Sequence, residues 1–203
     1  FAQLPEHASK LLNNAYQNLT FLASLLKDLS NLASSERSLL ETELAPLDPV
    51  SFCHAMIDGI RPKAEEQGLK LKFTHSTGLK KVTTSPQRVE EILMNFMTNA
   101  LKYSSRKNSI VELRISPSKM YQGGVCFSVS DSGIGMKKKD QAQLFTKFFR
   151  SENPQAQAVK GTGMGLYISK KQADKIGATI SLESTFGKGS VFSLDVPRDV
   201  KKA

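Results

Sequence analysis

The sequence predicts an α/β two-layer sandwich, a mixed sheet packed on helices, that follows a separate N-terminal helix. Two observations predict it: helical and strand patterns alternate after residue 47, and the apolar positions before residue 34 repeat at helical spacing instead. With 203 residues, 39% of them hydrophobic, the chain is long enough for one full domain and a smaller appendage. We expect a helical region over 1–46, a larger domain over 47–198 and a tail over 199–203.

The N-terminal helix carries a narrow apolar seam. Its members alternate in steps of three and four residues, a period typical of helices that pair in a coiled coil. They are Leu12, Ala15, Leu19, Leu22, Leu26, Leu29 and Ala33. We therefore expect a homodimer through the Leu12–Ala33 helix, with an ordinary amphipathic helix packed on its own domain as the alternative.

The larger domain opens with two helices separated by a strand. Asp48 before Pro49 is a typical helix start, and Gly68 is a typical helix end. A strand over 69–73 follows. Ser85 and Pro86 then begin a long helix to about Tyr103, with Ser85 as the expected cap.

The second half of the domain alternates strands with loops and short helices. Strands are expected near 110–116, 125–129, 179–184 and 190–196, and helices through Leu144 and over 164–176. Residues 41–46 read as a loop. The polar stretch over 151–160, which contains Pro154, predicts a mobile loop.

Composition excludes several classes of function. No run approaches the roughly 20 apolar residues of a membrane span, and the first residues lack a signal-peptide layout, so we expect a cytoplasmic chain without membrane insertion of its own. A membrane anchor elsewhere in a full-length protein is compatible with this.

Lys and Arg number 28 against 19 acids, but they are scattered and no aromatic residues interleave them, which argues against nucleic acid. Cys53 and Cys126 lie in apolar segments without metal-ligand spacing and are expected to be buried thiols.

Three motifs carry possible chemistry. Asn95, Asn99 and Lys102 lie on one face of the long helix, where neutral oxygens suit a hard cation that keeps phosphate ligands, although such a face is more often simply solvated. The run from Asp131 to Gly135 leaves a carboxylate at a strand end beside two glycines, which suits a flat ligand or a plain turn. The run from Gly161 to Leu166 opens a helix, where free amides suit phosphate.

Together, in this order, the motifs resemble the Bergerat fold of the superfamily that contains DNA gyrase, histidine kinases and MutL. The run from Asn95 to Ser104 is similar to the N box, the run from Asp131 to Gly135 to the first glycine box, and the run from Leu144 to Arg150 to the F box. The second and third glycine boxes match 161–166 and 186–189, so that the resemblance covers about 48–197. The paired asparagines resemble sensor histidine kinases, because gyrase and MutL normally have glutamate in place of Asn95.

The resemblance implies ATP and Mg2+ as ligands and gives each residue a role. Asn99 is expected to coordinate magnesium, with Asn95 supporting the metal or phosphate network and Lys102 contacting phosphate. Asp131 is expected to accept from the adenine amino group, and Arg150 to reach the phosphates. Residues 151–160 correspond to the lid over ATP. The remaining expected ATP-binding residues are Tyr103, Gly133, Gly135, Gly161, Thr162, Gly163, Met164, Gly165 and Leu166.

The family's phosphoacceptor motif is absent from this sequence. None of His7, His54 and His75 has the expected neighbours, so an acceptor histidine is expected upstream of this fragment. The resulting prediction is an ATP-dependent histidine autokinase module of a two-component system, with a response regulator or receiver domain as partner. The alternatives are a nucleotide-binding scaffold that does not autophosphorylate and an ATP-hydrolysing machine like gyrase or MutL.

Overall fold

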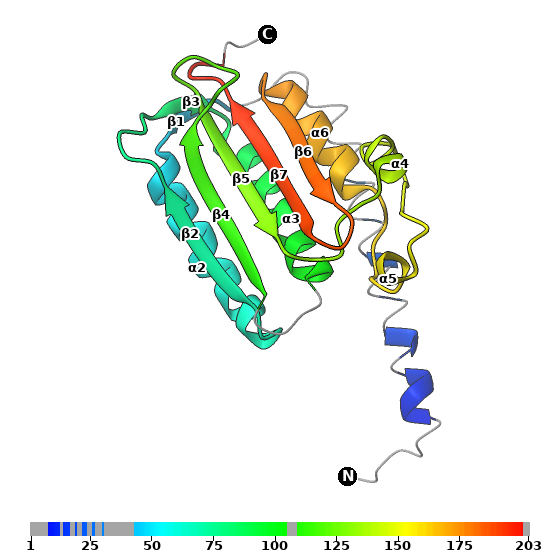
Figure 1. Cartoon of the computed structure of the whole chain (residues 1–203). Helices are drawn as coiled ribbons and strands as arrows, with labels where there is room; N and C mark the ends of the chain where they lie inside the picture. The colour runs from blue at the N-terminus through cyan, green and yellow to red at the C-terminus, as the bar shows by residue number, and fades with distance from the viewer. Residues whose placement is uncertain are drawn as a thin grey trace.

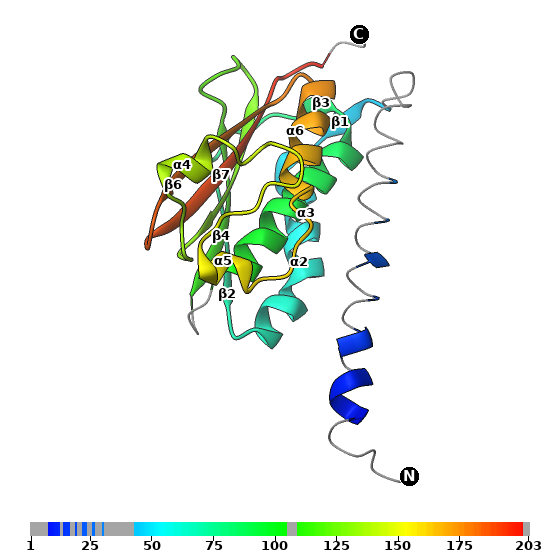
Figure 2. The ribbon, with the colours of Figure 1, turned by 90° about the vertical axis from the view of Figure 1, so that its right-hand side faces the viewer.

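The computed structural model describes residues 8–12, 14–16, 19, 22, 23, 26, 30, 43–104 and 109–200. Within them lies one layer of strands against one layer of helices, as Figures 1 and 2 show from two sides. The predicted α/β sandwich is confirmed. None of the described helices is both long and apolar enough to cross a bilayer.

The main sheet has five strands in the order β2-β4-β5-β7-β6. β2 (Lys70–His75) pairs parallel with β4 (Ile110–Pro117), while β5 (Val125–Asp131), β7 (Gly189–Val196) and β6 (Thr179–Thr185) continue antiparallel. Alternate residues of each strand face the helices, as expected for a half-buried sheet. Those of the central strands form the core: Val111, Leu113, Ile115, Val125, Phe127 and Val129 are all at most 1% exposed.

Three long helices cover one face of this sheet (Figure 2). They are α2 (Pro49–Glu66), α3 (Pro86–Tyr103) and α6 (Gly165–Lys175). The central helix, α3, buries an apolar stripe that includes Phe96. The centroid of the Phe96 ring lies 5.2 Å from that of the Phe192 ring on β7. Burying this stripe against the sheet fixes the opposite, polar stripe of α3, and so decides where Asn95 and Asn99 lie.

Four short elements complete the described secondary structure. A second sheet pairs β1 (Ala45–Leu47) with β3 (Val82–Thr84), so part of the segment predicted as a loop is a strand. The predicted helix through Leu144 is also corrected, because α4 is limited to Lys138–Gln141 and turns follow it. Within the expected loop over 151–160, residues Pro154–Gln157 form the short helix α5.

The helix starts agree only partly with their predicted caps. Asp48 accepts hydrogen bonds from the backbone N–H groups of Val50 and Ser51 at 3.1 Å, as a capping side chain should. Ser85 stands at the corresponding place on α3, but its side chain makes no capping hydrogen bond, and the residue is 4% exposed. Ser85 is therefore the N-cap residue of α3, as predicted, but it caps the helix without a side-chain hydrogen bond, and Pro86 follows it at the first helical position.

Both cysteines are free thiols, and the predicted burial is complete for Cys53 but only partial for Cys126. Cys53 is fully buried, which raises the pKa of its thiol to about 12, and partial burial also raises the pKa of Cys126. Because the thiolate is the reactive form, iodoacetamide at mildly alkaline pH should leave Cys53 unmodified in the native protein and modify Cys126 slowly. Mass spectrometry of native and urea-unfolded samples checks this, and rapid native alkylation of Cys53 would contradict it.

Candidate nucleotide-binding site

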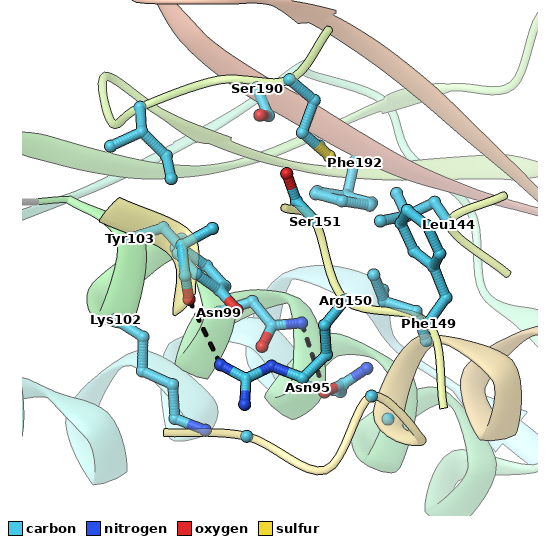
Figure 3. Close-up of a pocket in the computed structure, with 18 of the residues that line it drawn as sticks. Asn95, Asn99, Lys102, Tyr103, Leu144, Phe149, Arg150, Ser151, Ser190 and Phe192 are labelled. Carbon is cyan, nitrogen blue, oxygen red and sulfur yellow. Dashed lines mark hydrogen bonds between the residues drawn. The ribbon is translucent and has the colours of Figure 1, made fainter. Parts of the chain in front are cut away.

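A cavity of about 630 Å³ opens between the helical layer and the segment around α5. Elements distant in sequence contribute to its wall: α3, the end of β5, the start of α6, β7 and the loop before α5. Figure 3 shows the side chains that converge on it. Twelve of the predicted site residues line it: Asn95, Asn99, Lys102, Tyr103, Asp131, Gly135, Arg150, Gly161, Thr162, Gly163, Gly165 and Leu166.

Two predicted residues do not line the cavity. Met164 is 2% exposed and lies in the protein interior. Gly133 lies behind the wall, where a Cβ would collide with the backbone carbonyl of Tyr103. Its N–H donates to the Asp131 carboxylate at 2.8 Å, so Gly133 acts on the site through Asp131.

Asp131 ends β5 at one side of the cavity. Burial raises the pKa of its carboxyl, and hydrogen bonds from the backbone N–H groups of Gly133 and Ser190 act against that rise. It is the one acidic side chain among the described residues that line the cavity. A partly buried acceptor of this kind, beside the apolar side chains of Ile134, Met136 and Phe192, suits the edge of a flat, amine-bearing ring.

The glycine loop after Asp131 is held to the β6–β7 turn. Met136 donates its backbone N–H to the Ser184 hydroxyl at 2.9 Å, and Gly187 donates its own to the carbonyl of Ile134 at 2.8 Å. Gly135 has a φ of 59°, and a Cβ there would overlap the carbonyl of Thr185. Only glycine allows this approach, so Gly135 is what lets the loop lie against the β6–β7 turn.

The polar face of α3 forms the opposite side of the cavity. Asn95 donates from Nδ2 to the Ser169 hydroxyl of α6 at 2.8 Å. Asn99 donates from Nδ2 to Asn95 Oδ1 at 3.4 Å (Figure 3). Lys102 lies one turn further along the same face and also lines the cavity. Burial raises the pKa of the nearby Tyr103 hydroxyl, while the charge of Arg150 acts in the opposite direction, so the phenol stays protonated at neutral pH.

Arg150 follows the F box and is directed at the segment over 156–159. Its guanidinium donates to the carbonyls of Ala156, Gln157 and Val159 at 3.3, 3.2 and 2.6 Å. Those carbonyls lie at the C-terminal end of α5, where a cation is favourable. At the other end of α5, Asn153 accepts from the N–H of Gln155 at 3.0 Å. These contacts explain how a short polar segment forms a helix.

Two glycines allow the start of α6 to lie close to its neighbours, Gly163 to the F-box segment and Gly165 to α3. Gly163 has a φ of 72°, and a Cβ there would lie 2.7 Å from the carbonyl oxygen of Phe149. A Cβ on Gly165 would lie 2.6 Å from Asn95 Oδ1. The first N–H groups of α6 therefore lie beside the asparagine pair, an arrangement that suits anionic oxygens.

Several residues of the wall were not predicted. Ser190 and Phe192 reach the cavity because β7 pairs with β5, which places Ser190 opposite Asp131. Sequence patterns do not give the order of strands in a sheet, so they could not predict that Ser190 and Phe192 line the cavity. Tyr16, from the N-terminal helix, also lines the cavity. The other lining residues outside the predicted set are Ala100, Ile134, Met136, Leu144, Phe149, Ser151, Ala156 and Lys160.

The sequence is similar to a known protein family and to known histidine kinases. Residues 84–200 match the protein family described as histidine kinase-, DNA gyrase B-, and HSP90-like ATPase. The circadian input-output histidine kinase CikA of Synechococcus elongatus is 27% identical over 201 residues, which cover 97% of this chain and 26% of CikA. The chain spans between 9% and 26% of the length of the curated histidine kinases compared.

Solved structures share the fold. Full-length ShkA in complex with AMPPNP superposes with a TM-score of 0.78 at 25% identity, over the whole of this chain and 41% of ShkA. The histidine kinase ThkA, in complex with the response regulator protein TrrA, superposes with a TM-score of 0.73 at 20% identity, over 97% of this chain and 53% of ThkA. This chain belongs to the histidine kinase-, DNA gyrase B-, and HSP90-like ATPase family and carries the ATP-binding catalytic domain found in sensor histidine kinases.

Proposed function

We propose that this chain is the catalytic module of a protein-histidine kinase that transfers the γ-phosphoryl group of ATP to a histidine. The observation that carries the proposal is the charge distribution of the cavity, which has one acidic side chain, Asp131, and three cationic ones, Lys102, Arg150 and Lys160, among the described lining residues. That distribution suits an adenine amine at one end and a polyphosphate at the other.

The neutral side chain of Asn95 argues against the alternative of an ATP-hydrolysing machine like gyrase or MutL. Hydrolysis at this site requires a general base to activate water, whereas Asn95 is a neutral amide engaged by Ser169 and Asn99. A neutral imidazole already has a nucleophilic lone pair and needs no such base. Phosphoryl transfer then depends on aligning the acceptor and on neutralising charge, and Lys102 and the start of α6 line the cavity where they can neutralise charge.

Mg2+ fits the donors that α3 presents. The described residues contain no cluster of three His, Cys, Asp or Glu side chains that could hold a metal by themselves. Mg2+ keeps water and phosphate ligands and needs only one or two protein oxygens, and the Asn99 amide is the residue we assign to it. When bound, the ion would neutralise phosphate charge, and Asn95 would hold Asn99 in place.

We infer that neither of the two histidines that the structure describes is the acceptor. His54 and His75 flank the ring of Phe73, with centroid distances of 4.6 and 5.7 Å, and neither lines the cavity. His7 lies outside the described residues. We propose that the acceptor belongs to a helical hairpin of which residues 8–30 are part, and that a response regulator then takes the phosphoryl group, as the ThkA–TrrA complex suggests.

Calorimetric titration with a non-hydrolysable ATP analogue, with and without Mg2+, tests the nucleotide site. Binding that Mg2+ strengthens supports the kinase, and absence of binding in both conditions would favour a purely structural role. Incubation with ATP alone then separates kinase from ATPase, because rapid hydrolysis without an acceptor would favour the gyrase-like alternative. Tight binding with neither transfer to a supplied acceptor helix nor hydrolysis would indicate a nucleotide sensor.

The N-terminal seam predicts a dimer. Leu12, Leu19, Leu22 and Leu26 are 57%, 66%, 54% and 68% exposed in the single chain, while Leu29 and Ala33 lie outside the described residues. Since a second copy would bury these leucines, Leu22→Glu should convert a dimer to a monomer in analytical ultracentrifugation. Asn14→Glu, on the same helix but off the seam, is the control. A wild-type chain that already sediments as a monomer would contradict the dimer.

A further inference from the structure

Two polar stripes face each other where α6 packs on α3. On α6 the stripe consists of Gly165, Ser169 and Gln172, spaced four and three residues apart, so that all three lie on one side of the helix. On α3 it runs from Arg88 through Glu91 and Asn95 to Asn99. Ser169 and Gln172 are 3% and 5% exposed, so this is an internal seam of hydrogen bonds between two helices.

At the end of this seam away from the cavity, hydrogen bonds fix the position of α6 along α3. Arg88, 8% exposed, donates to Gln172 Oε1, and Gln172 Nε2 donates to the Glu91 carboxylate at 3.2 Å. A buried guanidinium and a buried amide are costly to leave unpaired, so a shift of α6 by one residue would be strongly disfavoured. This anchor holds Ser169 opposite Asn95.

Ser169 determines how the Asn95 amide is turned. Its hydroxyl accepts from Asn95 Nδ2 at 2.8 Å, which directs Asn95 Oδ1 away from Ser169. That oxygen accepts from Asn99 Nδ2 at 3.4 Å. The absence of a Cβ on Gly165 leaves room for Asn95 Oδ1 in this position. The chain of donors and acceptors thus runs in one direction, from Asn99 through Asn95 to Ser169.

This order determines which end of the Asn99 amide is available to the cavity. With Nδ2 committed to Asn95, the carbonyl oxygen Oδ1 of Asn99 remains for the cavity, which both asparagines line. A hard cation binds a carbonyl oxygen and is repelled by an amide N–H. We propose that Ser169 is a positioning residue that, through Asn95, presents the oxygen of Asn99 to the cation of the bound nucleotide.

This inference rests on the proposed function, and its test separates the two. In Ser169→Ala, Asn95 loses the acceptor that orients it, and Asn99 is free to turn its amide. We expect the Mg2+-loaded ATP analogue to bind about five- to tenfold more weakly, the usual consequence of losing one hydrogen bond. Binding of the same analogue in EDTA should stay within about twofold, because the adenine end of the cavity is unaltered. Calorimetry gives both affinities.

Two controls separate positioning from a merely structural role. Ser181→Ala, on the exposed edge strand β6, makes the same chemical change away from the cavity and should alter neither affinity. A double-mutant cycle with Asn99→Ala is the second control. Once the Asn99 amide is gone, Ser169→Ala should have no further effect on the Mg2+-dependent part of binding, whereas a structural defect would add to it.

The outcomes are distinct. Equal weakening of binding with and without Mg2+, or additive effects in the double-mutant cycle, would overturn the positioning role of Ser169. Unchanged Mg2+-dependent binding in Ser169→Ala would also overturn it, while leaving the proposed kinase function intact. Failure of the wild-type chain to bind the analogue at all would instead refute the proposed function. A circular dichroism melt of each variant confirms that it is folded before the affinities are compared.

Discussion

Asp131→Asn is expected to weaken binding of an ATP analogue by about 1–3 kcal/mol, which is typical for losing a charge-assisted hydrogen bond in a buried site. The carboxylate ends β5 inside the cavity, where it is placed to accept from the exocyclic amine of adenine. Guanine has a carbonyl oxygen in place of that amine, so discrimination between ATP and GTP analogues should shrink in the variant. Calorimetry with both analogues measures this, and unchanged ATP affinity would refute the assignment.

The same substitution should not destabilise the nucleotide-free protein. Because burial raises the pKa of Asp131, its contribution to stability is fully present below the ordinary carboxyl pKa and is lost as the pH rises through the raised value. At neutral pH the folded state therefore bears the cost of a desolvated charge, which an amide does not carry. The melting temperature of Asp131→Asn should stay level or rise. Asp58→Asn, at an exposed site on α2, is the matched control.

Asn99→Ala should have the largest effect on metal dependence. It removes the oxygen that we assign to Mg2+, so the ratio of nucleotide affinities with and without the ion should fall close to one. Phosphoryl transfer to a supplied acceptor helix should fall by about 100-fold or more, since removing one preorganised electrostatic contact to a transition state has effects of that size. Asn14→Ala, exposed on the N-terminal helix, is the control. A variant that keeps Mg2+-dependent binding would show that another residue holds the ion.

Sequence patterns predicted the parts of the fold that depend on local chemistry. The spacing of Asn95, Asn99 and Lys102 correctly placed them on one helical face, because α3 is long and strongly periodic. The strands of the main sheet were found from alternation, and the two free thiols from their apolar surroundings. In each case the residues that determine the outcome lie within one element.

The features that were missed depend on contacts between distant segments. β1 and β3 have three residues each, too few for a periodic signal, and exist because they pair with each other. The helix α5 forms where Arg150 binds the carbonyls of Ala156 and Val159. The polar sequence of 151–160 gives no sign of these contacts. Ser190 reaches the cavity through strand register alone.

The wall of the cavity has a further consequence for folding. Asn95 and Phe192 both line the cavity, yet more than half of the domain separates them along the chain. The site therefore forms only when β5 and β7 have paired and packed on α3. A nucleotide that binds only this assembled state stabilises it by mass action, by about 2.7 kcal/mol when present at 100 times its dissociation constant. In this domain, nucleotide occupancy is also a measure of how much of the chain has reached its native state.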